Sequence, residues 1–197
     1  MLVFSKARLV VLSVPKTGTT AIETALATHA ALVVSDPPEL KHAPVYRYNR
    51  FFRPMVEKFI AADVDIAAVI REPVSWLGSW YRYRGRDFLD GSPQSTSGLS
   101  FDDFVRGYLD EPRKGFANIG SQAKFVEPRP NGVSVSHLFR YEALDRFVAF
   151  LEDRLEQTID LPRVNVSPAA DLTLAPETEA RLRAACAEDF ALWDSTA

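Results

Sequence analysis

VLSVPKTGTTAIETAL, residues 11–26, joins an apolar run to a helical pattern through the turn PKTGTT, which is residues 15–20. Residues 8–14 are rich in β-branched side chains, which predicts a buried strand. Apolar residues recur at helical spacing over residues 19–31, and Thr19 or Thr20 is expected to cap that helix. A strand, a glycine-containing turn and a helix N-terminus predict an anion site, because backbone N–H groups and Lys16 converge there. The alternative is an ordinary βα turn with one exposed lysine.

The same alternation of strands and helices continues along the chain. Residues 32–35, 65–70 and 133–139 read as strands, and helical patterns cover 46–62, 74–83, 101–109, 121–126, 143–155 and 176–193. Continuous apolar strands separated by helices predict an α/β fold with a central, mostly parallel sheet flanked by helices. Neither a repeat nor a long linker interrupts the pattern, so residues 1–197 are expected to form a single domain.

Composition narrows the class of protein. The chain has 197 residues, 47% of them hydrophobic and 25% charged, with a formal net charge of −3. A broad basic face for nucleic acid is therefore not expected. The one cysteine, Cys186, excludes an intrachain disulfide and suits a cytoplasmic protein. The apolar run before Pro15 is too short to span a membrane.

A second polar segment, REPVSWLGSWY at residues 71–81, follows the apolar run 65–70. Arg71 and Ser79 are expected to hold one phosphate, through a charge-assisted and a hydroxyl hydrogen bond. The triphosphatase fingerprint GxxxxGK[ST] is missing, because Lys16 precedes Gly18, and Arg71 stands where those enzymes place a metal-binding aspartate. A ligand with phosphates at two ends and no bound metal is therefore expected.

PKTGTT and REPVSWLGSWY, in this order, resemble the 5′-phosphosulfate loop and the 3′-phosphate motif of sulfotransferases that use 3′-phosphoadenosine 5′-phosphosulfate (PAPS). Weaker likeness continues through FDDFV, FRYEAL and LPRVNVS, so most of the chain is covered. The resemblance implies a three-layer fold similar to P-loop NTPases, with PAPS as the cosubstrate. It also implies a set of cofactor-binding residues: Pro15, Lys16, Thr17, Gly18, Thr19, Thr20, Arg71 and Ser79. Arg163 is a candidate for the family's late basic loop, and Ala21 stands where many members carry an aromatic residue.

Sulfuryl transfer needs charge neutralised on the leaving phosphate and a base for the acceptor. Lys16 is the expected neutralising group. The segment ELKHAP, between the two motifs, offers His42 and Glu39 as the catalytic base, and both positions resemble bases used within the family. His42 is preferred, because an imidazole titrates near neutral pH without further tuning.

The function expected from these residues is transfer of a sulfuryl group from PAPS to a hydroxyl of a glycan or small metabolite. Two alternatives remain at this stage. One is a phosphotransferase with a related nucleotide loop, which would turn over ATP with magnesium. The other is an inactive module that binds 3′-phosphoadenosine 5′-phosphate (PAP). The acceptor and the oligomeric state are open.

Overall fold

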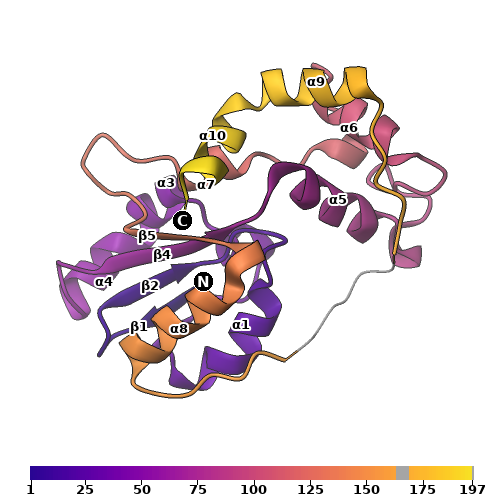
Figure 1. Ribbon diagram of the computed structural model, residues 1–197. Coiled ribbons are helices and arrows are strands. Elements are labelled where there is room, and N and C mark those ends of the chain that lie inside the picture. The colour runs from indigo at the N-terminus through magenta and orange to yellow at the C-terminus, as the bar shows by residue number, and fades with distance from the viewer. Residues whose placement is uncertain (163–168, 197) are drawn as a thin grey trace. The chain divides into compact units, whose positions relative to one another are not determined.

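Five strands form one mixed sheet in the computed structural model, which describes residues 1–162 and 169–196 (Figure 1). The strands are β1 (Leu2–Phe4), β2 (Leu9–Leu12), β3 (Leu32–Val33), β4 (Asp65–Ile70) and β5 (His137–Arg140). Their order across the sheet is β3-β1-β2-β4-β5. β4 lies parallel to both β2 and β5, whereas β1 is antiparallel to its two neighbours. The predicted α/β class is confirmed, with β1 making the sheet mixed.

Helical segments account for much of the remaining chain. They are α1 (Thr19–Leu26), η1 (Ala27–His29), α2 (Pro38–Lys41), α3 (Val45–Arg47), the π-helical turn η2 (Tyr48–Phe52), α4 (Arg53–Phe59), α5 (Pro73–Arg84), η3 (Asp87–Leu89), α6 (Phe101–Leu109), η4 (Gly115–Ala117), α7 (Gln122–Val126), η5 (Tyr141–Ala143), α8 (Leu144–Leu155), α9 (Pro176–Ala185) and α10 (Ala187–Ser195). Within the described ranges, none of these helices has the length and apolar character needed to cross a membrane.

The chain divides into two compact units. The sheet unit contains residues 1–71, 121–162 and 195–196, and the helical unit contains residues 72–120 and 169–194. All five strands belong to the sheet unit, together with α1, α8 and the contiguous helical segment 45–59.

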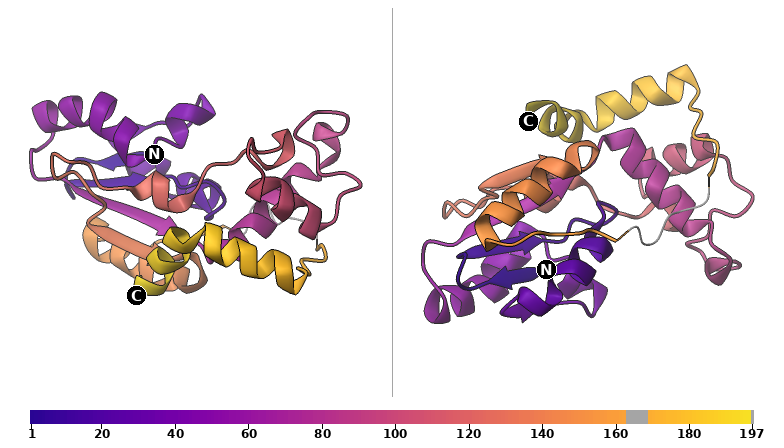
Figure 2. Two further views of the ribbon diagram at one scale, coloured as in Figure 1. Left: turned by 90° about the horizontal axis from the view of Figure 1, so that it is seen from above. Right: turned by 60° about the horizontal axis from the view of Figure 1, so that its bottom comes forward.

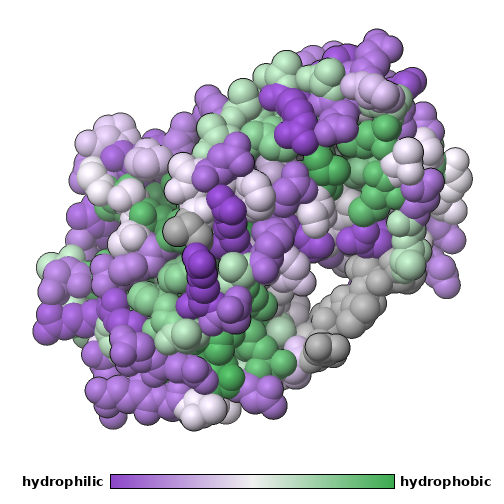
Figure 3. Space-filling model, in the orientation of Figure 1, coloured by the Kyte–Doolittle hydropathy of each residue, from purple (hydrophilic) through white to green (hydrophobic). Residues whose placement is uncertain are grey.

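Alternating side chains of the strands build the core of the sheet unit. One face of the sheet packs against α1 through Ile22 and Leu26, and against α8 through Phe147 and Leu151. Segment 45–59 covers the other face, so that the sheet lies between two helical layers (Figure 2). The opposite side of α8 carries exposed charged residues, and hydrophilic residues cover much of the face on which this helix lies (Figure 3). The helices therefore flank the sheet as predicted.

The helical unit has a separate apolar core. Trp76 and Leu77 of α5 pack with Phe104 of α6 and Leu182 of α9. Polar side chains cap the N-termini of α5 and α6. The Glu72 side chain accepts a hydrogen bond from the Ser75 amide at the start of α5, and Ser100 with Asp103 forms a reciprocal capping box on α6. Such caps satisfy amides that the first helical turn leaves without partners.

Candidate active site

The carboxyl ends of three adjacent parallel strands lie at one edge of the sheet. The turn 15–20 follows β2, Arg71 follows β4 and Tyr141 follows β5. Ile70 pairs with Arg140, so β4 and β5 end level, whereas Leu12 pairs with Ala68 and β2 ends two residues earlier. Ligands of α/β proteins bind at this edge, so the topology collects candidate groups that are far apart in the sequence.

The turn after β2 has an unusual backbone. Lys16 has φ 69°, in the left-handed region that non-glycine residues seldom occupy, and Gly18 has φ 78°. Buried Thr17 braces the turn, because its hydroxyl donates to the Val14 carbonyl over 2.9 Å. The bend turns the chain from β2 into α1, with the Lys16 side chain half-buried. The backbone of Lys16 therefore has a defined conformation within this turn.

Gly18, not a threonine, is the N-cap of α1. No side chain caps this helix, so the expected cap by Thr19 or Thr20 is wrong. Both residues are helical, which removes them from the extended backbone that a side-chain cap requires. The first amides that bond back to the Gly18 carbonyl belong to Ala21 and Ile22. The amides of Thr19 and Thr20 stand ahead of them at the positive end of the helix, where an anion is stabilised.

Arg71 lies against this turn. Its Nη1 donates to the Lys16 carbonyl oxygen over 3.5 Å, and its guanidinium carbon lies 4.5 Å from the centroid of the Tyr141 ring. Buried Gln122 fixes the Arg71 backbone by two hydrogen bonds: it accepts from the amide at 2.9 Å and donates to the carbonyl at 2.7 Å. Two cationic side chains, those of Lys16 and Arg71, thus arise from adjoining strand ends.

Tyr141 and Gln122 are functional candidates that the sequence patterns did not single out. Tyr141 contacts both halves of the site, because a Cβ added to Gly18 would lie 3.3 Å from its Cε2 atom while its ring lies against Arg71. The signal in the sequence was positional, since Tyr141 directly follows the strand that ends at Arg140. Gln122 comes from the start of α7 and carried no pattern of its own.

His42 lies beside the end of β2. Its Nδ1 is 2.7 Å from the Ser13 carbonyl oxygen, two residues before the turn begins. A carbonyl only accepts, so Nδ1 carries the hydrogen and Nε2 retains the lone pair in the neutral ring. Burial lowers the pKa of His42, and the hydrogen bond to Ser13 opposes this shift. A neutral imidazole with Nε2 able to take a proton is the form that a general base requires.

The other candidates have different surroundings. Glu39 is exposed on α2, and its backbone carbonyl accepts a hydrogen bond from Arg47. Ser79 is 7% exposed within α5 and belongs to the helical unit. Arg71 belongs to the sheet unit, as the last residue of its segment 1–71. Arg163 lies outside the described residues. The sheet unit therefore brings Arg71 against residues 15–20, which we call the lysine turn, and places His42 beside Ser13, two residues before that turn. A shared phosphate contact of Arg71 with Ser79 stays a prediction.

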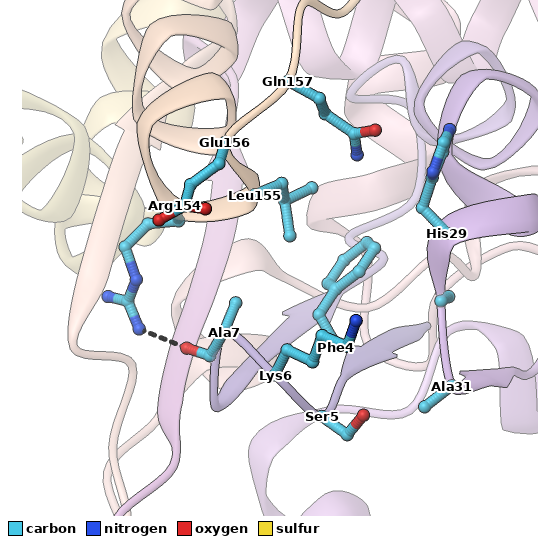
Figure 4. Close-up of a pocket in the computed structure, with 11 residues that line it drawn as sticks. Phe4, Ser5, Lys6, Ala7, His29, Ala31, Arg154, Leu155, Glu156 and Gln157 are labelled. Carbon is cyan, nitrogen blue, oxygen red and sulfur yellow. Dashed lines mark hydrogen bonds between the residues drawn. The ribbon is translucent and has the colours of Figure 1, made fainter.

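A hollow of about 450 Å³ lies elsewhere in the sheet unit (Figure 4). The turn between β1 and β2, the end of η1 and the C-terminal end of α8 line it, with His29 and Gln157 on opposite sides. Arg154 in its wall donates to the Ala7 carbonyl over 2.7 Å and to Asp65 over 2.8 Å. The β1–β2 turn precedes β2, so this hollow and the lysine turn lie at opposite ends of that strand.

No protein-family model matches the chain, and no curated protein matches it at a significant level.

Proposed function

We propose that the protein is a sulfotransferase that moves a sulfuryl group from PAPS to an acceptor hydroxyl of a glycan or small metabolite. The observation that carries the proposal is the approach of the Arg71 guanidinium to the Lys16 carbonyl, at 3.5 Å. Two cations on adjoining strand ends suit a ligand with two separated anionic groups, and PAPS has its phosphosulfate and its 3′-phosphate at opposite sides of one ribose.

The residues present fit such a ligand. The turn offers the amides of Thr19 and Thr20 together with the Lys16 ammonium to the 5′ end, and Arg71 offers a planar guanidinium to the 3′-phosphate. The Tyr141 ring restricts the Arg71 guanidinium, so less conformational freedom is lost when an anion binds.

PAPS supplies an activated sulfuryl group: its bond from sulfur to the bridging phosphate oxygen breaks as sulfur bonds to the acceptor oxygen, which leaves PAP. Lys16 stabilises the negative charge that grows on the leaving phosphate oxygen. His42 accepts the acceptor's proton at Nε2, while the Ser13 carbonyl holds Nδ1–H and so fixes the ring's tautomer. Burial keeps the ring neutral and ready to accept that proton.

Isothermal titration with PAP and with ATP, each without and with magnesium, tests the proposal. The expected result is PAP binding that needs no magnesium and is tighter than ATP binding. Arg71→Gln is expected to weaken PAP binding strongly. The matched control is Arg8→Gln, which removes another arginine of the sheet unit, exposed and paired with Asp63 at 2.8 Å. ATP binding that requires magnesium, with PAP bound weakly, would favour a phosphotransferase and contradict the proposal.

Sulfuryl transfer itself separates an enzyme from an inactive PAP-binding module. The assay is transfer of radiolabelled sulfate from PAPS to a panel of glycans and small hydroxyl compounds. An active enzyme is expected to label at least one acceptor, and His42→Ala is expected to abolish that labelling without changing PAP affinity. Tight PAP binding with no labelled acceptor would favour the inactive module.

A further inference from the structure

Segment 45–59 of the sheet unit exposes a row of large apolar side chains. Phe51, Met55 and Phe59 are 57%, 41% and 74% exposed, and their spacing of four residues places them on one side of the segment. Val45, Tyr48 and Val56 are at most 2% exposed and hold the other side against the protein. Burying the inner row fixes the orientation of the segment, so the outer row remains in solvent. We call Phe51, Met55 and Phe59 the apolar stripe.

Cations accompany the apolar stripe. Arg50 and Lys58 precede Phe51 and Phe59 by one residue, and both are exposed. The Arg50 guanidinium lies 5.2 Å from the Phe51 ring centroid, and the Lys58 ammonium lies 5.4 Å from that of Phe59. The acidic residue of the segment, Glu57, is engaged by Arg53 and therefore does not neutralise Arg50 or Lys58.

We propose that this face docks on an anionic lipid surface. Aromatic and methionine side chains can enter the boundary between headgroups and acyl chains, while long cationic side chains keep their charge among lipid phosphates. The arrangement of Phe51, Met55 and Phe59 beside Arg50 and Lys58 meets both requirements on one exposed helical segment.

Charge decides between a lipid surface and a second copy of the chain. The net charge of the protein is −3, so the chain as a whole is not drawn to an anionic membrane. Charges beyond about 10 Å are largely screened at 0.1 M salt, which leaves the local cations to dominate at contact. Pairing of the face with its copy would instead bring Arg50 and Lys58 of two molecules together, and like charges repel. This inference is independent of the proposed sulfuryl transfer.

Co-sedimentation with phosphatidylcholine vesicles, with and without phosphatidylglycerol, tests the proposal. The wild type is expected to bind the anionic vesicles, more weakly as salt rises, and to bind the neutral vesicles poorly. Phe51→Ser with Phe59→Ser is expected to lower partitioning about tenfold or more, because two aromatic anchors are lost. Arg50→Gln with Lys58→Gln is expected to lower binding and flatten its dependence on salt.

Phe88→Ser is the matched control, because Phe88 is 66% exposed but lies in the helical unit, away from the apolar stripe in sequence. It is expected to leave vesicle binding unchanged, and circular dichroism melts verify that every variant folds. Equal binding of the wild type to neutral and anionic vesicles would overturn the proposal, as would binding that the stripe variants do not alter. A wild-type dimer that dissociates in the Phe51→Ser, Phe59→Ser variant would assign the face to a second copy and likewise overturn it.

Discussion

Gly18→Ala tests the turn 15–20, because it adds backbone strain at Gly18 and a contact with the Tyr141 ring. Gly18 has φ 78°, where an L-residue costs about 1–2 kcal/mol, and its new Cβ would lie 3.3 Å from Cε2 of Tyr141. In a protein of this size, the strain alone is expected to lower the melting temperature by about 2–8 °C. The crowded ring must also move by a few tenths of an ångström, and Arg71 rests on that ring.

Gly132→Ala provides the control for backbone strain. Gly132 has φ 86° and nothing within 4 Å of an added Cβ, so the substitution introduces a similar strain without a collision. In thermal unfolding, Gly132→Ala is expected to show the loss caused by backbone strain alone, and Gly18→Ala at least as large a loss. Only Gly18→Ala is expected to weaken PAP binding in titration, by about tenfold, the size of one disturbed cation–π contact. Equal PAP affinities of the two variants would refute the link from the turn through Tyr141 to Arg71.

Three further predictions concern His42, Asp65 and Ser100. Burial lowers the pKa of His42 in the free protein, so kcat/KM for transfer is expected to fall on the acid side with an apparent pKa below 6.5, measured as kcat/KM against pH. The Arg154 side chain lowers the pKa of Asp65 in the folded protein, so the pair stabilises the fold above the unfolded pKa of Asp65, and this stabilisation is lost as pH falls through the folded pKa. Asp65→Asn is expected to lower the free energy of unfolding at pH 7 by about 1 kcal/mol or less, because the pair is partly exposed. In urea unfolding, the same variant is expected to depend less on pH in the acid range. Ser100→Ala breaks the capping box with Asp103 and is expected to lower the free energy of unfolding by about 1 kcal/mol, measured by urea unfolding at pH 7.

The spacing of apolar residues predicted those strands and helices whose ends are also marked by a capping or turn-forming residue. The apolar run 65–70 became β4 with the same bounds, and the residues after Ser100 became α6 as expected. The strand Leu2–Phe4 was missed, because three apolar residues before a polar turn carry no period. The π-helical turn within segment 45–59 and the glycine cap of α1 were also missed, since both depend on backbone angles that side-chain patterns do not reveal.

The site was predictable only in part for a similar reason. Parallel pairing of β2 with β4 follows from the alternation of strands and helices, and it accounts for the approach of Arg71 to the lysine turn. Tyr141 and Gln122 reach the same place from the strand end and the helix start of a later part of the chain. Their contribution depends on side-chain contacts between distant segments, which no local pattern encodes.

The two anion contacts are separated most directly by titrating 5′-AMP, 3′-AMP and PAP into the wild type, Lys16→Ala and Arg71→Gln. Lys16→Ala is expected to weaken 5′-AMP and PAP while sparing 3′-AMP, and Arg71→Gln is expected to weaken 3′-AMP and PAP while sparing 5′-AMP. Loss of all three ligands to the same extent in both variants would show that Lys16 and Arg71 act on one phosphate, and would contradict the account of a ligand held at two ends.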